Sequence, residues 1–220
     1  MDTKELIIEA AKRLFAQHGI TSTSLRQITA AARVNLAAVN YHFGTKAALV
    51  HVVLKRLLLP LSEQRLQNFA SIMAKDTPPT LEEVLHAYYF PWFERFNQQT
   101  EAGRLNTQLF NKLIYETDEE IRKSVSEIVA PVTEKYLSLF QQLFPELPEA
   151  ELIWRFKVMH GVVTTHYISE LVPLRVSENT PSEAQSLAWV MTYLTATWQA
   201  PATPVVSETR STLREEQKNR

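Results

Sequence analysis

Helical periodicity is the feature that most restricts the fold of this chain. Apolar residues recur at three- and four-residue spacing, and we find no segment with the strict alternation of a half-buried strand. The first stripe is typical, because Ile7, Ala10, Ala11, Leu14 and Phe15 share one helical face. Only four glycines occur in 220 residues, so glycine rarely interrupts these patterns. The sequence therefore predicts an all-α protein, with about nine helices in all.

The first 60 residues are expected to form a head of short helices. Ser24 precedes the second apolar stripe, and Gln27 three residues later completes the pattern of a capping box. A short third helix is predicted at Asn35–Phe43, with its first residue as N-cap. Together with the first helix these make a small trihelical unit, in which residues 24–43 form a helix-turn-helix.

Pro60 marks the expected boundary between the head and a larger body. A fourth helical pattern begins after Thr45, its predicted N-cap, and continues past this proline. Because proline lacks the backbone N–H, we expect it to kink or interrupt the helix. The prediction is a head at residues 1–60 and a helical body at residues 61–199. The remaining residues, 200–220, are poor in large apolar side chains and are expected to form a weakly ordered tail.

Charge is distributed unevenly between the two parts. No acidic residue occurs between Glu9 and Glu63, whereas that interval contains seven Lys/Arg. Residues 1–56 carry eight Lys/Arg against three Asp/Glu, a net charge of +5, and the rest of the chain carries −6. A basic head suits a polyanionic partner, and an acidic body does not.

Several classes of function are disfavoured by what the sequence lacks. Without cysteine there can be no disulfide or thiolate metal site. We find no glycine-rich phosphate loop, nucleophile elbow or paired-histidine metal motif. His160 and His166 are six residues apart and do not share a helix face. We therefore expect no catalytic residue, no metal site and no cofactor, and a protein that is not an enzyme.

A membrane location is also not expected. The chain begins with an amphipathic, charged segment that does not resemble a signal peptide. The longest apolar run, Leu49–Leu61, is too short to span a bilayer and contains His51, Lys55 and Arg56. The expected location is the cytoplasm.

Residues 23–49, TSLRQITAAARVNLAAVNYHFGTKAAL, closely resemble the N-terminal helix-turn-helix of TetR-type transcriptional regulators. The likeness covers about the first 60 residues, and the rest of the chain matches only in being helical and of suitable length. The residues that carry it are Leu25, Ile28, Ala31, Val34, Val39, Tyr41, His42, Phe43, Lys46 and Leu49. The resemblance implies a dimeric repressor whose body binds a small molecule, and a two-fold dimer suits a roughly palindromic operator in double-stranded DNA.

The third predicted helix would enter the major groove, with its N-terminal part against base edges. Ala37 and Ala38 cannot both face inward, so at least one is bare and permits close approach to a thymine methyl. Asn40 either binds an adenine edge or is solvated. The predicted DNA-binding residues are Ser24, Arg26, Arg33, Asn35, Leu36, Ala37, Ala38, Asn40, Tyr41, His42 and Lys46.

The charged and ring-bearing residues of this set suit phosphate contacts. Tyr41 and His42 resemble the family's phosphate-contacting rings, although simple packing explains His42 nearly as well. Lys46 adds its charge to the free N–H groups at a helix start. Arg33 replaces the glycine common in the family's turn, and is either an added phosphate contact or a solvated side chain. Asn40 replaces a common aromatic, so both departures affect the operator sequence.

The body is rich in aromatic residues, and some of them are expected to line a ligand cavity while most pack the core. Arg95, Arg104 and Arg155 are candidate partners for an anionic group on a largely apolar ligand. The predicted ligand-binding residues are Tyr88, Tyr89, Trp92, Phe93, Phe96, Phe110, Tyr115, Trp154 and Met159. A helical lipid- or coenzyme-binding protein without DNA activity is the alternative, although such a carrier would not need an acid-free head.

The last two long helical patterns, residues 149–170 and 182–199, are the best candidates for a homodimer interface. The first offers a strip of small residues and the second an apolar stripe, although helices this apolar can also simply close the core. The predicted interface residues are Gly161, Thr164, Thr165, Leu187, Val190, Met191, Leu194 and Trp198.

Overall fold

The computed structural model describes residues 2–97, 99–168 and 182–203, without the side chains of residues 164–168 and 183. Within these ranges the chain forms nine α-helices and no strand, which confirms the all-α prediction. None of the helices in the described ranges is long and apolar enough to span a membrane.

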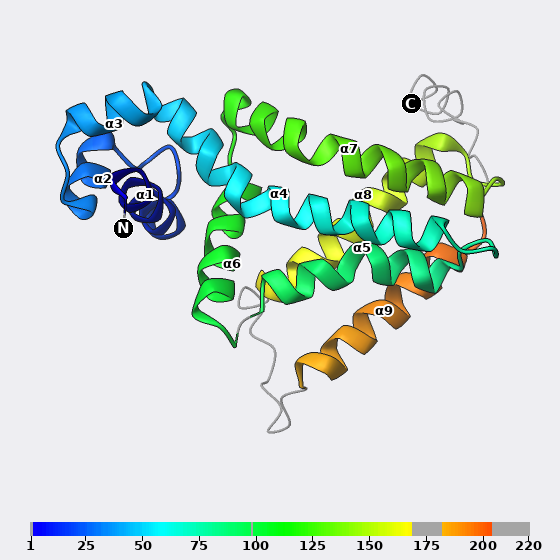
Figure 1. Cartoon of the computed structure of the whole chain (residues 1–220). Coiled ribbons are helices and arrows are strands. Elements are labelled where there is room, and N and C mark those ends of the chain that lie inside the picture. The colour runs from blue at the N-terminus through cyan, green and yellow to red at the C-terminus, as the bar shows by residue number, and fades with distance from the viewer. Residues whose placement is uncertain (1, 98, 169–181, 204–220) are drawn as a thin grey trace, which may run out of the picture.

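Three helices form the head at one end of the molecule (Figure 1). They are α1 (Thr3–His18), α2 (Leu25–Ala32) and α3 (Leu36–Phe43). The predicted capping residues form the expected hydrogen bonds at the starts of α2 and α3. Ser24 and Gln27 form a complete capping box at α2, and the Asn35 side chain accepts from the Ala38 N–H at 2.9 Å. The helix starts in the head were therefore predicted correctly.

The body is built from α4 (Lys46–Met73), α5 (Leu81–Arg95), α6 (Glu101–Ile114), α7 (Glu119–Leu143), α8 (Glu149–Ile168) and α9 (Glu183–Gln199). Helix α4 starts in the head and runs into the body, where it packs against α5 and α7 (Figure 1). Helix α9 packs against α5 and α8, and α6 contacts α1 of the head. The head is thus attached to the body both by continuous helix and by packing.

Pro60 does not interrupt α4, which continues to Met73, although the helix changes direction along its length (Figure 1). The proline removes the hydrogen bond to the carbonyl four residues earlier, that of Arg56. Arg95 of α5 replaces it: its Nη2 donates to the Arg56 carbonyl and its Nε to the Leu57 carbonyl at 2.5 Å. A side chain from the neighbouring helix thus donates hydrogen bonds to the backbone carbonyls beside the gap that Pro60 causes.

Side chains of α4 compensate in the same way for the hydrogen bond that Pro91 removes from α5. The carbonyl four residues before it, that of Ala87, accepts from Asn68 Nδ2 at 3.0 Å. The next carbonyl, that of Tyr88, accepts from Arg65 Nε at 2.7 Å. The two proline-containing helices therefore brace each other reciprocally, and a change in their relative position breaks hydrogen bonds on both sides.

The C-terminal end of α9 is held by a buried arginine of α8. Arg155 donates through Nη1 and Nη2 to four backbone carbonyls at the end of this helix and just beyond it, and its Nη2 also binds Glu151 at 2.6 Å. The four carbonyls belong to Thr197, Trp198, Ala200 and Pro201. Residues 200–203, expected to begin a weakly ordered tail, are therefore fixed here. The rest of that predicted tail, residues 204–220, lies outside the described residues.

Candidate functional site

The outer face of α3 carries the exposed side chains of the head. Leu36, Ala37, Asn40 and Tyr41 recur at helical spacing and are all exposed, with Tyr41 at 86%. The opposite face packs inward through Val39, which is fully buried. Ala37 is thus the bare small residue that the sequence required, and Ala38 is half-buried. One helix face thus brings together Leu36, Ala37 and Asn40, for which base contacts were expected, with Tyr41, for which a phosphate contact was expected.

Asn35 has a structural task at the start of this helix, since its side-chain oxygen caps α3. Ser24 is occupied in the same way at α2, where its hydroxyl and backbone bond Gln27. Arg26 and Arg33 are exposed on the head. Arg33 lies in the turn with φ 55° and ψ 43°, the left-handed region that glycine adopts without cost. The turn thus accepts a side chain in a glycine-like conformation.

Two residues expected to bind phosphate are partly engaged within the protein. The Lys46 ammonium donates to the Thr21 carbonyl at 3.2 Å, and Thr21 in turn donates to Glu116, which follows α6, at 3.0 Å. His42 is half-buried, and its ring lies edge-on to that of Tyr41 at 5.1 Å. Lys46 therefore lies where the head meets the body.

A cleft of about 410 Å³ opens at this junction. Its walls come from the head, through Ile20, Lys46 and Val50, and from the start of α7, through Ile121 and Lys123. The cleft separates the two parts where the Thr21–Glu116 hydrogen bond joins them, so relative movement of head and body would change its width.

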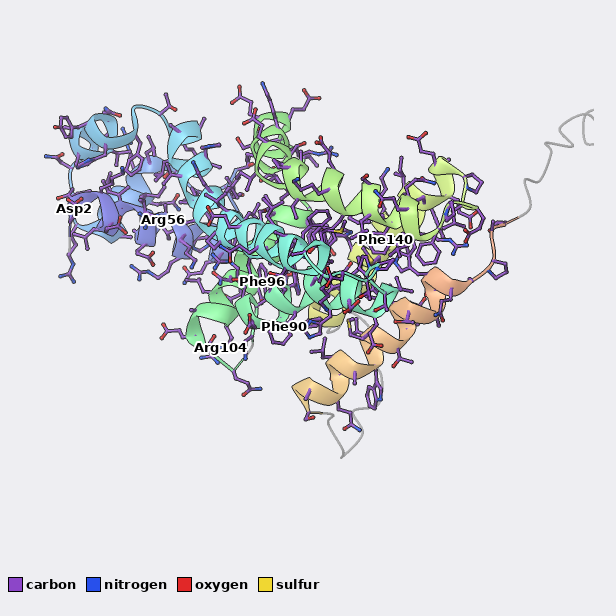
Figure 2. The ribbon with its side chains drawn as sticks, turned by 45° about the vertical axis from the view of Figure 1, so that its right-hand side comes forward. Asp2, Arg56, Phe90, Phe96, Arg104 and Phe140 are labelled. Carbon is purple, nitrogen blue, oxygen red and sulfur yellow. The ribbon has the colours of Figure 1, made fainter. Side chains whose placement is uncertain are left out.

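The aromatic residues of α5 divide into two packed groups. Trp92 stacks on Phe96 with 4.0 Å between the ring centroids. Phe110 of α6 lies edge-on to Trp92, with 4.5 Å between their centroids. Tyr88 contacts Tyr136 of α7 and Phe156 of α8, at 4.8 and 5.6 Å between ring centroids. Figure 2 labels Phe96 near the head end of the body and Phe140, which is buried, in the other half.

The remaining residues predicted for a ligand site take different places. Tyr89 and Phe93 are buried in α5. Met159 is buried on α8, where its sulfur accepts from the Trp198 indole N–H at 3.2 Å. Tyr115 and Trp154 are 67% and 60% exposed, and so belong to neither aromatic group. For these two the expectation of a place in a shared cavity is corrected.

Two buried polar atoms on α5 have no hydrogen-bond partner among the described residues. They are the Tyr89 hydroxyl and the Trp92 indole N–H. Such a group normally loses about 1–3 kcal/mol of stability relative to a paired one. Burial raises the pKa of Tyr89 well above its usual value, so the hydroxyl remains neutral and able to donate. Together with Asn106 Oδ1 of α6, which also lacks a partner, these atoms are positions in the described body where a polar ligand group would remove an existing cost.

The three arginines proposed as anion partners are corrected by the structure. Arg95 and Arg155 are occupied by backbone carbonyls, as described above. Arg104 is exposed on α6, toward the edge of the molecule (Figure 2). The sequence reasoning missed Arg65, which is only 5% exposed. A signal was present, because Arg65 continues the apolar stripe of Leu58 and Leu61 on α4.

The α9 residues expected at a dimer interface also require correction. Val190, Leu194 and Trp198 are buried within this same chain, and Trp198 stacks on Phe140 at 4.1 Å. Leu187 and Met191 are half-buried. The surface of α9 instead presents Trp189 and Tyr193, which are 58% and 56% exposed. The apolar stripe closes the core of this chain, and the aromatic residues between its members face outward.

The α8 residues of that prediction are only partly described. Gly161 is exposed, and a Cβ added there would meet nothing within 4 Å. Thr164 and Thr165 lie within α8, but their side chains fall outside the described residues. Among the described residues no group of histidines and carboxylates is suited to a metal ion.

Family models match both parts of the chain. The model for bacterial regulatory proteins of the tetR family matches residues 7–53, which contain α2 and α3. The model for the tetracyclin repressor-like C-terminal domain matches residues 86–197, about half of the chain. The two models together cover the head and most of the body in the expected order.

Individual relatives agree with this assignment. The probable HTH-type transcriptional regulator YttP of Bacillus subtilis is 26% identical over 189 residues, which are 81% of this chain and 86% of YttP. The HTH-type transcriptional repressor Rv3405c of Mycobacterium tuberculosis is 49% identical over 51 residues, 23% of this chain and 27% of that protein. The second likeness is therefore confined to a short segment.

Solved structures share the fold. SmeT, described as the repressor of the Stenotrophomonas maltophilia multidrug efflux pump SmeDEF, matches with a TM-score of 0.61 and 18% identity, over 92% of this chain and 96% of SmeT. NalD of Pseudomonas aeruginosa matches with a TM-score of 0.59 and 23% identity, over 89% and 94%. The helix-turn-helix with its exposed α3 and the two family matches lead to one conclusion: the chain belongs to the tetR family of bacterial regulatory proteins and is a DNA-binding transcriptional regulator.

Proposed function

We propose that the protein is a homodimeric repressor, active in the cytoplasm, that binds a roughly palindromic operator and is released by a small, largely apolar molecule. The bare face of α3, in a basic head that has no acidic residue after Glu9, carries the proposal. Phosphate contacts would set the register of this helix, and few side chains would read bases. Selecting bound fragments from the host genome tests it: a two-fold symmetric motif is expected, and fragments without a shared motif would contradict it.

Asn40→Ala and Lys46→Ala should weaken DNA binding in different ways. Asn40 is exposed beside Ala37, so its loss should cost about 1–3 kcal/mol on the operator and little on random DNA. Loss of Lys46 should weaken both about equally and reduce the salt slope by roughly one unit. Fluorescence anisotropy at several salt concentrations measures both effects, with Lys112→Ala in the body as control. Equal losses for both variants on operator and random DNA would contradict base reading by Asn40.

The exposed aromatic residues of α9 support a dimer through this part of the body. Trp189 and Tyr193 are one helical turn apart and more than half exposed, which is costly for a protomer alone in water. The proposed interface therefore contains Trp189 and Tyr193 in place of the buried Val190, Leu194 and Trp198. The surface of α8 around Gly161 remains part of this interface.

Trp189→Glu should convert the dimer into monomers. A carboxylate at the centre of an apolar interface is desolvated without a partner, which is strongly unfavourable. The monomer should also lose operator affinity, because the spacing of two α3 helices is no longer fixed. Light scattering measures the mass, and Tyr115→Glu, at an equally exposed aromatic residue outside α8 and α9, is the control. A Trp189→Glu protein that remains dimeric would move the interface elsewhere.

The proposed switch uses the braced pair α4 and α5. Helix α5 carries the aromatic groups and the unpaired Tyr89 and Trp92 atoms, and α4 continues into the head. A ligand that moves α5 would alter the brace at Pro60 and so the position of α3. It can do so only by its difference in affinity for the two arrangements, about 1–3 kcal/mol for typical couplings.

The switch is tested by a thermal-shift screen followed by operator titration with each hit. We expect hits that lower operator affinity roughly 5–150-fold. Trp92→Ala should weaken the binding of such a hit, since Trp92 packs with Phe96 and Phe110 and its indole N–H has no partner among the described residues. A tight ligand that leaves operator affinity unchanged would remove the switch from the proposal.

A further inference from the structure

Five polar side chains, four of them buried and one half-buried, form a cluster in the body where α4, α5, α7 and α8 meet. They share closely packed surroundings of aromatic rings, and none of them is an acid. The members are Arg65, Tyr88, Tyr89, Tyr136 and His160. This group, called the Arg65 cluster below, contains one permanent positive charge.

Arg65 is unusual because its charge is buried without an opposite one. Its side chain is 5% exposed, and its Cζ lies 3.8 Å from the centroid of the Tyr88 ring. Among the described residues its Nε binds the Tyr88 carbonyl, and no carboxylate lies within ion-pair distance. Buried arginines are normally paired with an acid, because removing the charge from water is expensive.

The surrounding groups do not supply the missing negative charge. His160 Nδ1 lies 2.7 Å from the Phe156 carbonyl and therefore donates, so Nε2 accepts from the Tyr88 hydroxyl at 2.7 Å. Burial lowers the pKa of His160 to about 4, with Arg65 adding to the shift, so the ring is neutral at pH 7. Desolvation raises the pKa of Tyr88, Tyr89 and Tyr136 while Arg65 opposes it, so these hydroxyls also stay neutral.

Two donor groups in the cluster remain available. The Tyr136 hydroxyl donates to the Arg65 carbonyl at 2.9 Å, and Tyr88 is occupied by His160. The terminal nitrogens of Arg65 have no hydrogen-bond acceptor among the described residues, and neither does the Tyr89 hydroxyl. The guanidinium of a largely buried side chain and an unpaired buried hydroxyl, both neighbours of Tyr88, can therefore donate to an anionic acceptor.

We propose that the Arg65 cluster binds the carboxylate of the effector, and that the effector is an apolar monocarboxylate. A carboxylate can accept two hydrogen bonds from a guanidinium and a further one from a tyrosine hydroxyl. The rest of the ligand is apolar because the cluster is enclosed by rings such as Phe156. This inference rests on the proposed ligand-responsive repressor and specifies the chemistry of its ligand.

Binding at this place acts directly on the brace between α4 and α5. Arg65 Nε holds the Tyr88 carbonyl that follows the backbone gap left by Pro91. A carboxylate on the same guanidinium draws Arg65 toward the ligand, and room for the apolar part requires α5 to move against α4. The Arg65 cluster is thus placed to link ligand binding with the helix that leads to the head.

The test compares straight-chain carboxylates from butanoate to dodecanoate with the primary amide of each chain length. Binding to the full-length protein is measured by calorimetry at pH 7.5, where the acids are ionised. The wild-type protein is expected to bind the best carboxylate about 10–100-fold more tightly than its amide, as suits a charge-assisted contact in a buried site. Arg65→Met should reduce this ratio to about one, and the matched variant Arg104→Met should retain it.

Tyr89→Phe is the second variant, and it tests the cluster even if the Arg65→Met protein does not fold. Removing an unpaired buried hydroxyl should raise the melting temperature of the free protein by about 2–4 °C. The same change should weaken carboxylate binding about 3–10-fold. A purely structural role for Tyr89 would not give opposite effects on stability and binding.

Several outcomes would overturn the inference. These are equal binding of acids and amides, binding of no carboxylate in the series, and an undiminished preference in folded Arg65→Met protein. A neutral compound that releases the operator without any preference for acids would also reject the Arg65 cluster, but it would leave the proposed repressor intact. A carboxylate that binds through Arg65 without changing operator affinity would support the cluster and reject the switch.

Discussion

Arg155→Met is expected to reduce the free energy of unfolding by about 3–5 kcal/mol, the range found when one partner of a buried polar network is removed. Arg155 is 4% exposed and is the donor for four backbone carbonyls at the end of α9. Methionine keeps the apolar stem of the side chain but cannot donate hydrogen bonds, so the four carbonyls lose their donor. The last turn of α9 and residues 200–203 would then lose their attachment to α8.

Urea denaturation at a fixed protein concentration measures this loss, since oligomerisation makes stability concentration-dependent. Lys157→Met is the matched control, because it removes a positive charge from an exposed position on the same helix. A loss for Arg155→Met of less than about 1 kcal/mol would mean that water replaces its hydrogen bonds, and that α9 is held by apolar packing alone.

Arg95→Met should cost about 2–3 kcal/mol in the wild-type chain and much less when Pro60 is replaced by alanine. In the wild-type protein the Arg56 and Leu57 carbonyls depend on Arg95, because residue 60 has no N–H. In Pro60→Ala the backbone can make the missing helical bond itself. The two substitutions are thus expected to be coupled by about 1–2 kcal/mol.

A double-mutant cycle of Arg95→Met and Pro60→Ala measures this coupling, with Arg122→Met as an exposed control on α7. The same proteins should be titrated with operator and ligand. Loss of the brace should weaken the effect of ligand on operator affinity, because α5 then moves without moving α4. Additive stabilities in the cycle would show that Arg95 does not compensate for Pro60.

The comparison of sequence with structure separates two kinds of residue. Caps were predicted correctly at Ser24, Asn35 and Thr45, because a cap joins residues only three positions apart. The bare face of α3 was also predictable in outline, since a short helix with apolar Val39 turned inward must expose the opposite side.

Long-range partners could not be predicted in the same way. Arg95 and Arg155 were expected to face a ligand and instead bind backbone carbonyls of α4 and of the α9 end. The stripe containing Leu194 and Trp198 was assigned to a partner subunit and lies in the protomer core. Both errors have one origin, because a sequence gives the polarity of a helix face but not the neighbour against which the face packs.

The sequence by itself determined the all-α fold, the helix starts of the head and the basic, exposed helix-turn-helix. These depend on contacts within a few residues and on net charge, which need no knowledge of packing. The tertiary structure alone decided that α4 and α5 repair each other's proline gaps and that Arg65 is buried without an acid. The reason is physical: the energy of a buried donor or charge depends on which atoms surround it, and only packing of distant helices provides those atoms.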